Sequence, residues 1–208
     1  MDISTMERTR IIPVVVLDDA ADAVPLARAL VAGGLPLIEV TFRTAAAADS
    51  IAAIAAEVPD AVPGAGTVIN TAQVEAARRA GAQFLVSPGI LPSVVQAAAA
   101  AELPIFPGAT SATEIMTALD LGLDVVKFFP AEIAGGVKAI KALSGPFPQV
   151  RFIPTGGVNE ANLTAYLGLS SVVAVGGTWM VGKPLVRAKA WDQITSLAAQ
   201  AVSEAQSA

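Results

Sequence analysis

Short apolar runs recur along the chain and are separated by segments with helical spacing. Apolar residues recur at intervals of three or four, as in helices packed on one face, in segments 20–32, 45–57, 71–80, 91–101, 111–121, 136–143 and 159–167. The runs between them are rich in Val, Ile, Leu and Phe and centre on Val15, Glu39, Ala65, Leu85, Ile105, Lys127, Phe152 and Val173. The pattern therefore predicts eight strands that alternate with helices.

Strands of near-continuous apolar character indicate a parallel sheet covered by helices. We predict an α/β fold, a single (β/α)8 TIM barrel, because closing the sheet removes both of its edges. A leucine-rich solenoid has a similar repeat length, but the chain lacks its Leu-x-x-Leu-x-Leu signature. A doubly wound open sheet normally has a glycine fingerprint after its first strand, and residues 16–20 contain no glycine.

The length of 208 residues suits one barrel domain. We expect a single domain over 1–208, with an N-terminal extension over 1–10, a barrel core over 11–178 and a C-terminal helix over 185–205. Several of the predicted strands end at a proline, which cannot continue a strand ladder and marks the point where the chain leaves the sheet. These ends are Ser87-Pro88-Gly89, Phe106-Pro107-Gly108, Phe129-Pro130-Ala131 and Ile153-Pro154-Thr155-Gly156-Gly157. In a barrel, the end that they share carries the active site.

One lysine, Lys127, lies in the middle of an apolar run that reads as a buried strand. Burial disfavours the ammonium form of a lysine, so a buried amine can act as a nucleophile near neutral pH and form a Schiff base. The alternative is a lysine that extends to solvent or pairs with a carboxylate. The other lysines occur in segments that are typical of exposed helix faces or loops: Lys138, Lys141, Lys183 and Lys189.

The second predicted strand places three polar residues on one face. Its period of two aligns Glu39, Thr41 and Arg43. Burying such polar side chains is unfavourable unless they are paired or take part in binding or catalysis. We expect them to face Lys127. A structural salt bridge of Glu39 with Arg43 or with Lys127 is the alternative, although buried pairs are weak evidence for stability.

Paired glycines follow the seventh and eighth predicted strands. They occur in Thr155-Gly156-Gly157-Val158-Asn159, which leads into a predicted helix, and in Val175-Gly176-Gly177-Thr178. Glycines let backbone amides approach an anion, and barrels commonly bind phosphate at this position. Ordinary loop glycines are the alternative, but their occurrence on two consecutive strands favours phosphate binding.

Composition excludes several kinds of chemistry. The chain has no cysteine and no histidine, so it has no disulfide, thiolate nucleophile, imidazole base or common zinc ligand. We expect an enzyme that needs no metal or other cofactor.

A net charge of −5 without a basic cluster argues against nucleic acid as a partner. The sequence shows neither a signal peptide nor a membrane-spanning run, so we expect no membrane association and a cytoplasmic location.

Five motifs together resemble those of the 2-keto-3-deoxy-6-phosphogluconate (KDPG) aldolase family, the class I aldolases of the Entner–Doudoroff pathway. The resemblance runs through nearly the whole chain and keeps the motif order of the family. The motifs are Leu37-Ile38-Glu39-Val40-Thr41-Phe42-Arg43, Gly64-Ala65-Gly66-Thr67, Val86-Ser87-Pro88-Gly89, Lys127-Phe128-Phe129-Pro130-Ala131-Glu132 and Pro154-Thr155-Gly156-Gly157.

The resemblance implies a role for each matching residue. Lys127 would form the Schiff base and Glu39 would be the general acid/base. The residues implied for the pyruvyl carboxylate and its pocket are Arg43, Thr67, Pro88 and Phe129. Those implied for phosphate are Gly156, Gly157, Gly177 and Thr178. Many members have a serine where this chain has Thr178, which keeps the hydroxyl.

The implied reaction is reversible cleavage of KDPG to pyruvate and D-glyceraldehyde 3-phosphate, by a protein that is commonly a homotrimer. One alternative is cleavage of 4-hydroxy-2-oxoglutarate (KHG), whose leaving aldehyde carries a carboxylate instead of a phosphate. Another is a non-catalytic barrel that serves as an oligomeric scaffold. The presence of Glu39, Arg43 and Lys127 argues against the scaffold.

Overall fold

The structure is a computed structural model that describes residues 3–208. Within this range the chain forms eight strands, and every pairing between them is parallel. The strands are β1 (Ile11–Val15), β2 (Leu37–Thr41), β3 (Val62–Gly66), β4 (Leu85–Val86), β5 (Ile105–Phe106), β6 (Val125–Phe128), β7 (Arg151–Pro154) and β8 (Val175–Gly177). The predicted strands are confirmed, as is the predicted α/β class with parallel pairing.

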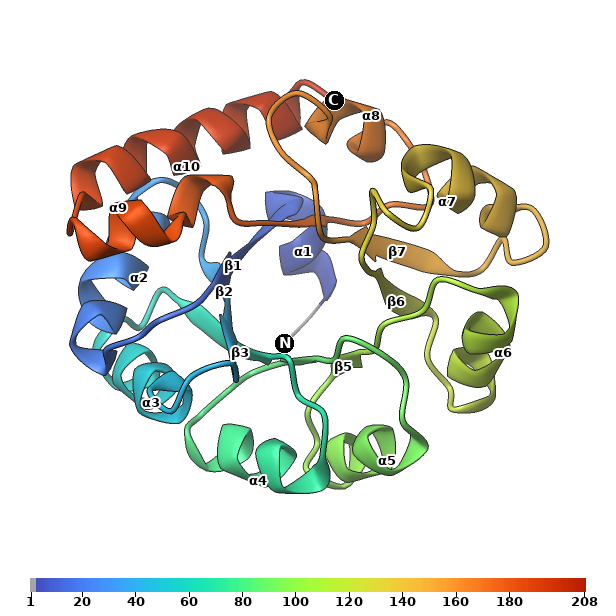
Figure 1. Ribbon diagram of the computed structural model, residues 1–208, viewed down its shortest axis with the longest axis horizontal. Coiled ribbons are helices and arrows are strands. Elements are labelled where there is room, and N and C mark those ends of the chain that lie inside the picture. Colours follow the sequence, from blue (N-terminus) through green and yellow to red (C-terminus); the bar gives the residue numbers. More distant parts are fainter. Residues whose placement is uncertain (1–2) are drawn as a thin grey trace.

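The strands form two sheets that lie around a common centre (Figure 1). Six strands pair in the order β5-β4-β3-β2-β1-β8, and β6 pairs with β7. Isolated parallel bridges connect the two sheets at both junctions, between Gly108 and Lys127, Phe152 and Val172, and Thr155 and Gly176. At the first junction, the amide of Lys127 donates to the carbonyl of Pro107 over 2.8 Å. Lys127 is therefore fixed on both sides by neighbouring backbone.

One helix, α1 (Ile3–Thr9), lies in the middle of the strands in the view of Figure 1, and the larger helices surround the strands on the outside. The other helices are η1 (Ala20–Asp22), α2 (Ala23–Ala32), α3 (Ala47–Glu57), α4 (Thr71–Arg79), α5 (Pro92–Ala100), α6 (Ala112–Asp120), α7 (Gly136–Ser144), α8 (Leu163–Leu167), η2 (Trp179–Val181), α9 (Lys183–Arg187) and α10 (Trp191–Gln206). None of the helices within residues 3–208 combines the length and the hydrophobicity that a membrane-spanning segment needs.

Two predicted helices differ from the observed ones. The predicted helix over 159–167 is confined to α8, because the side chain of Asn159 accepts a hydrogen bond from the amide of Ala161 and forms a turn before the helix. The segment predicted as one helix over 185–205 is divided between α9 and α10. Lys189 lies between them with a left-handed backbone (φ 52°), which no regular helix contains.

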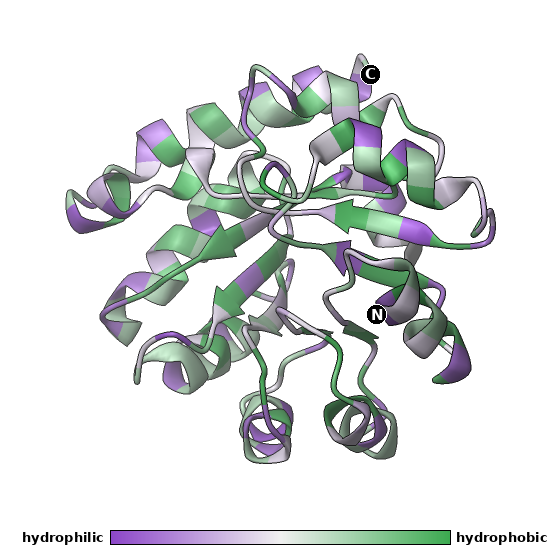
Figure 2. Cartoon of the chain, turned by 45° about the vertical axis from the view of Figure 1, so that its right-hand side comes forward, coloured by the Kyte–Doolittle hydropathy of each residue, from purple (hydrophilic) through white to green (hydrophobic). Residues whose placement is uncertain are grey.

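Two apolar clusters hold the molecule together. One lies between strands and helices, and hydrophobic residues accordingly run along the strands and alternate with hydrophilic ones along the helices (Figure 2). The other cluster lies inside the ring of strands and comprises Met6, Ile12, Leu37, Phe84, Val86, Phe106, Val125, Ile153, Val173 and Ala174. Met6 belongs to α1, so the segment predicted as an extension contributes a fully buried side chain to the interior.

Candidate active site

A lysine and a glutamate meet inside the ring of strands. Leu37 on β2 and Val125 on β6 point into the inner cluster, so strand alternation directs Glu39 and Lys127 to the same interior. Both are almost completely buried, with exposed fractions of 2% and 3%. Lys127 Nζ donates to Glu39 Oε1 over 3.2 Å, although 88 residues separate them along the chain. The predicted proximity of these two residues is confirmed.

The amine of Lys127 also contacts an aromatic ring. Its Nζ lies 5.1 Å from the ring centre of Phe129, which directly follows β6. A cation at this distance is stabilised by the negative face of the ring. The buried amine therefore has a carboxylate and an aromatic face as neighbours, and Phe129 is brought to the site as expected.

Thr41 and Arg43, the other polar residues of the predicted constellation, have different surroundings. Thr41 is fully buried, but its hydroxyl donates to the carbonyl of Val15 over 3.0 Å, which connects the ends of β2 and β1. Strand β2 ends at Thr41, and Arg43 lies beyond it with an exposed side chain. The expectation that all three polar residues face Lys127 from one strand is therefore wrong, because the strand ends too early.

Arg43 contacts Thr67, the residue that follows β3. Arg43 Nε donates to Thr67 Oγ1 over 3.2 Å. Thr67 has a left-handed backbone, with φ 59°. This conformation is rare for a β-branched residue and stores strain, which is often found at functional sites. The two residues that the resemblance implies for a carboxylate therefore lie side by side, with a strained backbone at one of them.

Pro88 lies close to the strand that carries Lys127. A β-carbon added at Gly108 would lie only 2.1 Å from the carbonyl oxygen of Pro88, so the chains after β4 and β5 touch through their backbones. Gly108 in turn bridges to Lys127. The proline-marked ends of β4, β5 and β6 are therefore adjacent, as the sequence predicts.

The glycine turn after β7 has a left-handed backbone at both glycines. Gly156 and Gly157 have φ values of 96° and 85°, which L side chains rarely adopt. Within residues 3–208 the amide of Gly157 has no hydrogen-bond acceptor. A helix follows this turn as predicted, but α8 begins at Leu163 instead of at residue 159. The side-chain amide of Asn162 donates to the carbonyl of Gly157 over 3.0 Å.

The second glycine pair ends β8, next to the first. Thr155 bridges to Gly176, which places the two turns on adjacent strands. A β-carbon at Gly177 would overlap the ring of Trp179, so only glycine fits there. Thr178 follows with an exposed side chain. The structure therefore brings the four residues expected at a phosphate to two neighbouring strand ends.

Two further buried polar residues, Ser87 and Thr155, belong to this end of the strands, with exposed fractions of 4% and 6%. Sequence reasoning quoted both within motifs but assigned roles to the neighbouring proline and glycines. Their position directly after β4 and β7 is the signal that could have identified them. The amide of Thr155 donates to the carbonyl of Phe128 over 2.9 Å, which places Thr155 beside the strand of Lys127.

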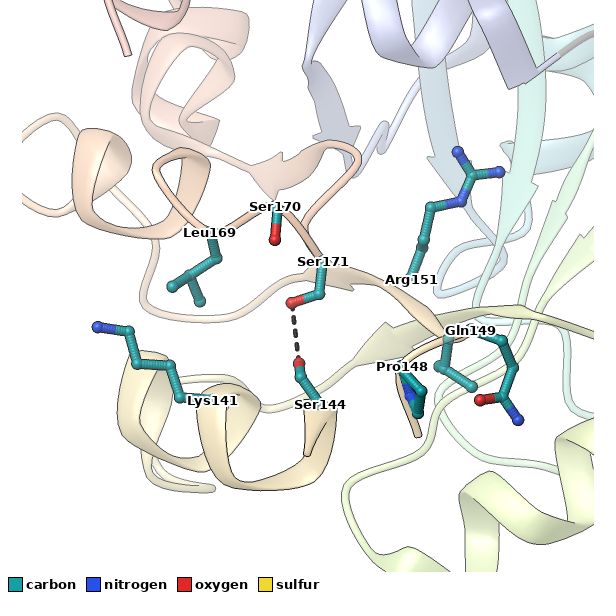
Figure 3. Close-up of a pocket in the computed structure, with 9 residues that line it drawn as sticks. Lys141, Ser144, Pro148, Gln149, Arg151, Leu169, Ser170 and Ser171 are labelled. Atoms are coloured by element: carbon teal, nitrogen blue, oxygen red, sulfur yellow. Dashed lines mark hydrogen bonds between the residues drawn. The ribbon is translucent and has the colours of Figure 1, made fainter. Parts of the chain in front are cut away.

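A separate cavity of about 440 Å³ lies at the opposite end of the strands (Figure 3). Its lining includes Arg151, the first residue of β7, and the hydroxyls of Ser144 and Ser171, which are 2.9 Å apart. Its lining includes none of the residues predicted for the active site. Among the described residues, no group of three or more Asp or Glu side chains is arranged to hold a metal ion.

Comparison with known proteins places this geometry in a family. Residues 3–197 match the family described as KDPG and KHG aldolase. The chain belongs to this aldolase family. This match confirms the family that the motifs suggest, and the chain is therefore a carbon–carbon lyase. The KHG/KDPG aldolase of Escherichia coli K12 is 49% identical over 195 residues, which cover 94% of this chain and 92% of the relative.

Solved structures of other aldolases closely resemble this one. The 2-keto-3-deoxy-6-phosphogluconate aldolase of Zymomonas mobilis ZM4, solved with 3-phosphoglycerate, is 46% identical, with a TM-score of 0.89 over 97% of this chain and 95% of that one. The KDPG aldolase of Legionella pneumophila was solved with pyruvate captured at low pH as a covalent carbinolamine intermediate. It is 41% identical, with a TM-score of 0.93 over 96% of this chain and 97% of that one.

Proposed function

We propose that this aldolase cleaves KDPG reversibly to pyruvate and D-glyceraldehyde 3-phosphate, with Lys127 as the imine-forming nucleophile and Glu39 as the general acid/base. The observation that carries the proposal is the buried contact of 3.2 Å between Lys127 Nζ and Glu39 Oε1. A lysine must lose a proton before it attacks a carbonyl, and this carboxylate is within reach to accept it. The carbinolamine of pyruvate in the Legionella relative supports the same chemistry.

The proposed reaction proceeds through an imine on Lys127. The neutral amine attacks the C2 carbonyl of the substrate, and the carbinolamine loses water to give an iminium. Glu39 takes the proton of the C4 hydroxyl, the C3–C4 bond breaks, and its electron pair moves into the iminium to give an enamine. Glyceraldehyde 3-phosphate leaves. Protonation of the enamine at C3 and hydrolysis of the imine then release pyruvate and restore the amine.

Other residues at this end of the strands would bind the two ends of the substrate. We assign the pyruvyl carboxylate to Arg43, whose planar guanidinium can bind two oxygens, and to the hydroxyl of Thr67. Pro88 and Phe129 would line the pocket between them and the amine. The phosphate would bind at the turns after β7 and β8, at Gly156, Gly157, Gly177 and Thr178. The amide of Gly157, which has no acceptor within residues 3–208, supports this assignment.

The proposal treats the fold as a complete (β/α)8 barrel in which β6 and β7 close the sheet of six strands. The isolated bridges at both junctions support closure. In such a barrel the active site lies where the strands end, and the residues assigned above lie on β2, β6 and β8 or within three residues of the ends of β2, β3, β4, β6, β7 and β8.

Borohydride trapping tests the catalytic assignment. The protein is incubated with pyruvate and borohydride, and the adduct is located by peptide mass spectrometry, because reduction fixes an imine on the lysine that formed it. We expect a single adduct at Lys127. Lys127→Met should abolish it, whereas the matched control Lys138→Met, on the exposed face of α7, should trap as the parent does. A folded protein that gives no adduct, or one at another lysine, contradicts the proposal.

KHG cleavage is a second candidate activity, favoured by the likeness to the Escherichia coli KHG/KDPG aldolase. Both substrates yield pyruvate, so a single assay for pyruvate release compares them directly. If phosphate binding contributes to recognition, KDPG should have the lower KM, and inorganic phosphate should inhibit its cleavage competitively. Equal KM values and no inhibition would favour KHG.

A further inference from the structure

A buried tyrosine contacts the loop that follows the catalytic strand. Tyr166 is the only tyrosine in the chain and its side chain on α8 is fully buried. Its hydroxyl donates to Oε1 of Glu132, which ends the motif of residues 127–132. Neither residue has a role in the reaction proposed above. The contact therefore joins an outer helix to the loop after β6.

Glu132 lies directly against the glycine turn to which we assign phosphate. A β-carbon at Gly157 would lie 2.4 Å from Glu132 Cγ. The side chain of Glu132 therefore occupies the space that a side chain at position 157 would need. The backbone amide of Glu132 donates to the carbonyl of Gly156 over 3.1 Å, and that of Ala131 donates to the carbonyl of Thr155 over 2.8 Å. Glu132 therefore contacts this turn through both its backbone and its side chain.

Tyr166 is suited to act as a permanent donor. Burial raises the pKa of its phenol far above the usual value, and the hydrogen bond to the negatively charged Glu132 raises it further. The hydroxyl consequently keeps its proton at every pH at which the enzyme would work. A hydrogen bond to a charged acceptor is also stronger than one between neutral groups.

We propose that Tyr166 and Glu132 are positioning residues that hold the Gly156–Gly157 turn in the conformation that binds the phosphate of the substrate. Tyr166 restrains the carboxylate of Glu132, and the stem of Glu132 restrains Gly157. This inference rests on the proposed function, because it deepens the assignment of phosphate to this turn. Neither side chain is assigned a contact with the reacting carbon atoms.

The position of the pair predicts which kinetic constant it controls. Lys127 is fixed independently, because its amide donates to Pro107 and its carbonyl accepts from Ala109. Loss of the Tyr166 hydroxyl should therefore leave the amine and Glu39 in place and disturb only the turn. An interaction that serves binding in the ground state and the transition state alike changes KM and leaves kcat unchanged.

The test compares Tyr166→Phe and Glu132→Ala with the parent on two substrates that share a carbon skeleton: KDPG and 2-keto-3-deoxygluconate, which lacks the phosphate. We expect both variants to raise the KM for KDPG about threefold to tenfold, since one hydrogen bond of this kind is lost. The kcat for KDPG and the kcat/KM for the unphosphorylated substrate should stay within about twofold of the parent. The inhibition constant of inorganic phosphate should rise with the KM for KDPG.

Three further variants make the test specific. Glu132→Gln keeps an oxygen that can accept from Tyr166 and should recover most of the KM. The double variant Tyr166→Phe/Glu132→Ala should be no worse than Glu132→Ala, because both changes break one contact. Ser144→Ala removes a hydroxyl that donates within α7, at the opposite end of the strands, and serves as the control for hydroxyl loss. It should change neither constant.

The outcomes separate this inference from the proposed function. An unchanged KM for KDPG in Tyr166→Phe, or equal losses on both substrates, overturns the positioning role while turnover and trapping at Lys127 stand. Absence of turnover and trapping in the parent overturns the proposed function itself. If Tyr166→Phe fails to fold, Glu132→Gln and Glu132→Ala carry the same comparison, because Glu132 is exposed at the surface.

Discussion

Gly66 lies directly against the side chain of Glu39. A β-carbon at Gly66 would be 2.3 Å from Glu39 Oε1 and 2.6 Å from Glu39 Cγ. The absence of a side chain at Gly66 on β3 is therefore what allows the carboxylate of Glu39 to reach Lys127. A glycine that contacts no substrate in the proposed reaction thus decides where the proposed general acid/base lies.

Gly66→Ala should displace the carboxylate of Glu39 and lower kcat strongly. A catalytic group moved by about 1 Å can lose about 100-fold in rate. Steady-state kinetics check this expectation. Gly145→Ala is the matched control, because its β-carbon would make only an ordinary contact, 3.5 Å from the carbonyl oxygen of Ala142. Full activity in Gly66→Ala would show that the position of Glu39 is not critical.

Lys127→Met should abolish turnover and also destabilise the fold, because it leaves the buried carboxylate of Glu39 without its cation. Removing one partner of a buried ion pair typically costs about 3–5 kcal/mol. Adding Glu39→Gln should recover much of this loss, since it removes the unpaired charge. Thermal unfolding of the parent, the single variant and the double variant measures it. Equal Tm values for the two variants would contradict the pairing.

Thr67→Asn should make the protein more stable and a poorer enzyme. Asparagine tolerates the left-handed backbone at this position, and relief of the strain is worth about 1 kcal/mol. The KM for pyruvyl substrates should rise, because the hydroxyl that accepts from Arg43 is lost. Thr113→Asn, exposed on α6, is the control for the substitution itself. A lower Tm in Thr67→Asn would contradict the strain at Thr67.

Alkaline titration should reveal the environment of Tyr166. The chain has one tyrosine, so ultraviolet absorbance of phenolate reports this residue alone. Its folded pKa is raised, whereas the unfolded value is about 10. The stability that this shift contributes is therefore complete below about pH 10 and is lost as pH rises through the folded pKa.

Native protein should consequently show little phenolate at about pH 11, whereas protein unfolded in denaturant should titrate near pH 10. Glu132→Gln should move the native titration to lower pH, because it removes the negative charge beside the phenol. A native titration that matches the unfolded one would contradict the buried contact of Tyr166 with Glu132.

The sequence predicts this fold well because its signals are local. Eight apolar runs, four of which end at a proline, indicate parallel strands that finish at one common edge, and Lys127 is conspicuous because a charged residue interrupts such a run. The pairing of Lys127 with Glu39 follows from the two strand patterns, since both residues lie on inward-facing positions. These elements depend on periodicity, which a single sequence contains.

Features that depend on particular side-chain and backbone contacts are not predictable from the hydrophobic pattern. No local pattern marks the end of β2 at Thr41, which moves Arg43 out of the strand and beside Thr67. The side chain of Asn159 shortens a helix that its sequence otherwise favours. The sequence alone predicts Tyr166 to be an ordinary aromatic residue of the core, because its contact with Glu132 forms only in the folded chain. In each case the deciding partner is a side chain or backbone group whose position only the folded chain defines.

The contact between Glu39 and Lys127 joins strands from different sheets of the fold, and this has a consequence for synthesis on the ribosome. Glu39 emerges from the ribosome 88 residues before its partner does. The first strands cannot bury their carboxylate stably until β6 arrives, because an unpaired buried charge is strongly unfavourable. The ion pair thus makes stable burial of Glu39 depend on the later half of the chain, so Lys127 and Glu39 are buried together only after β6 has joined the other strands.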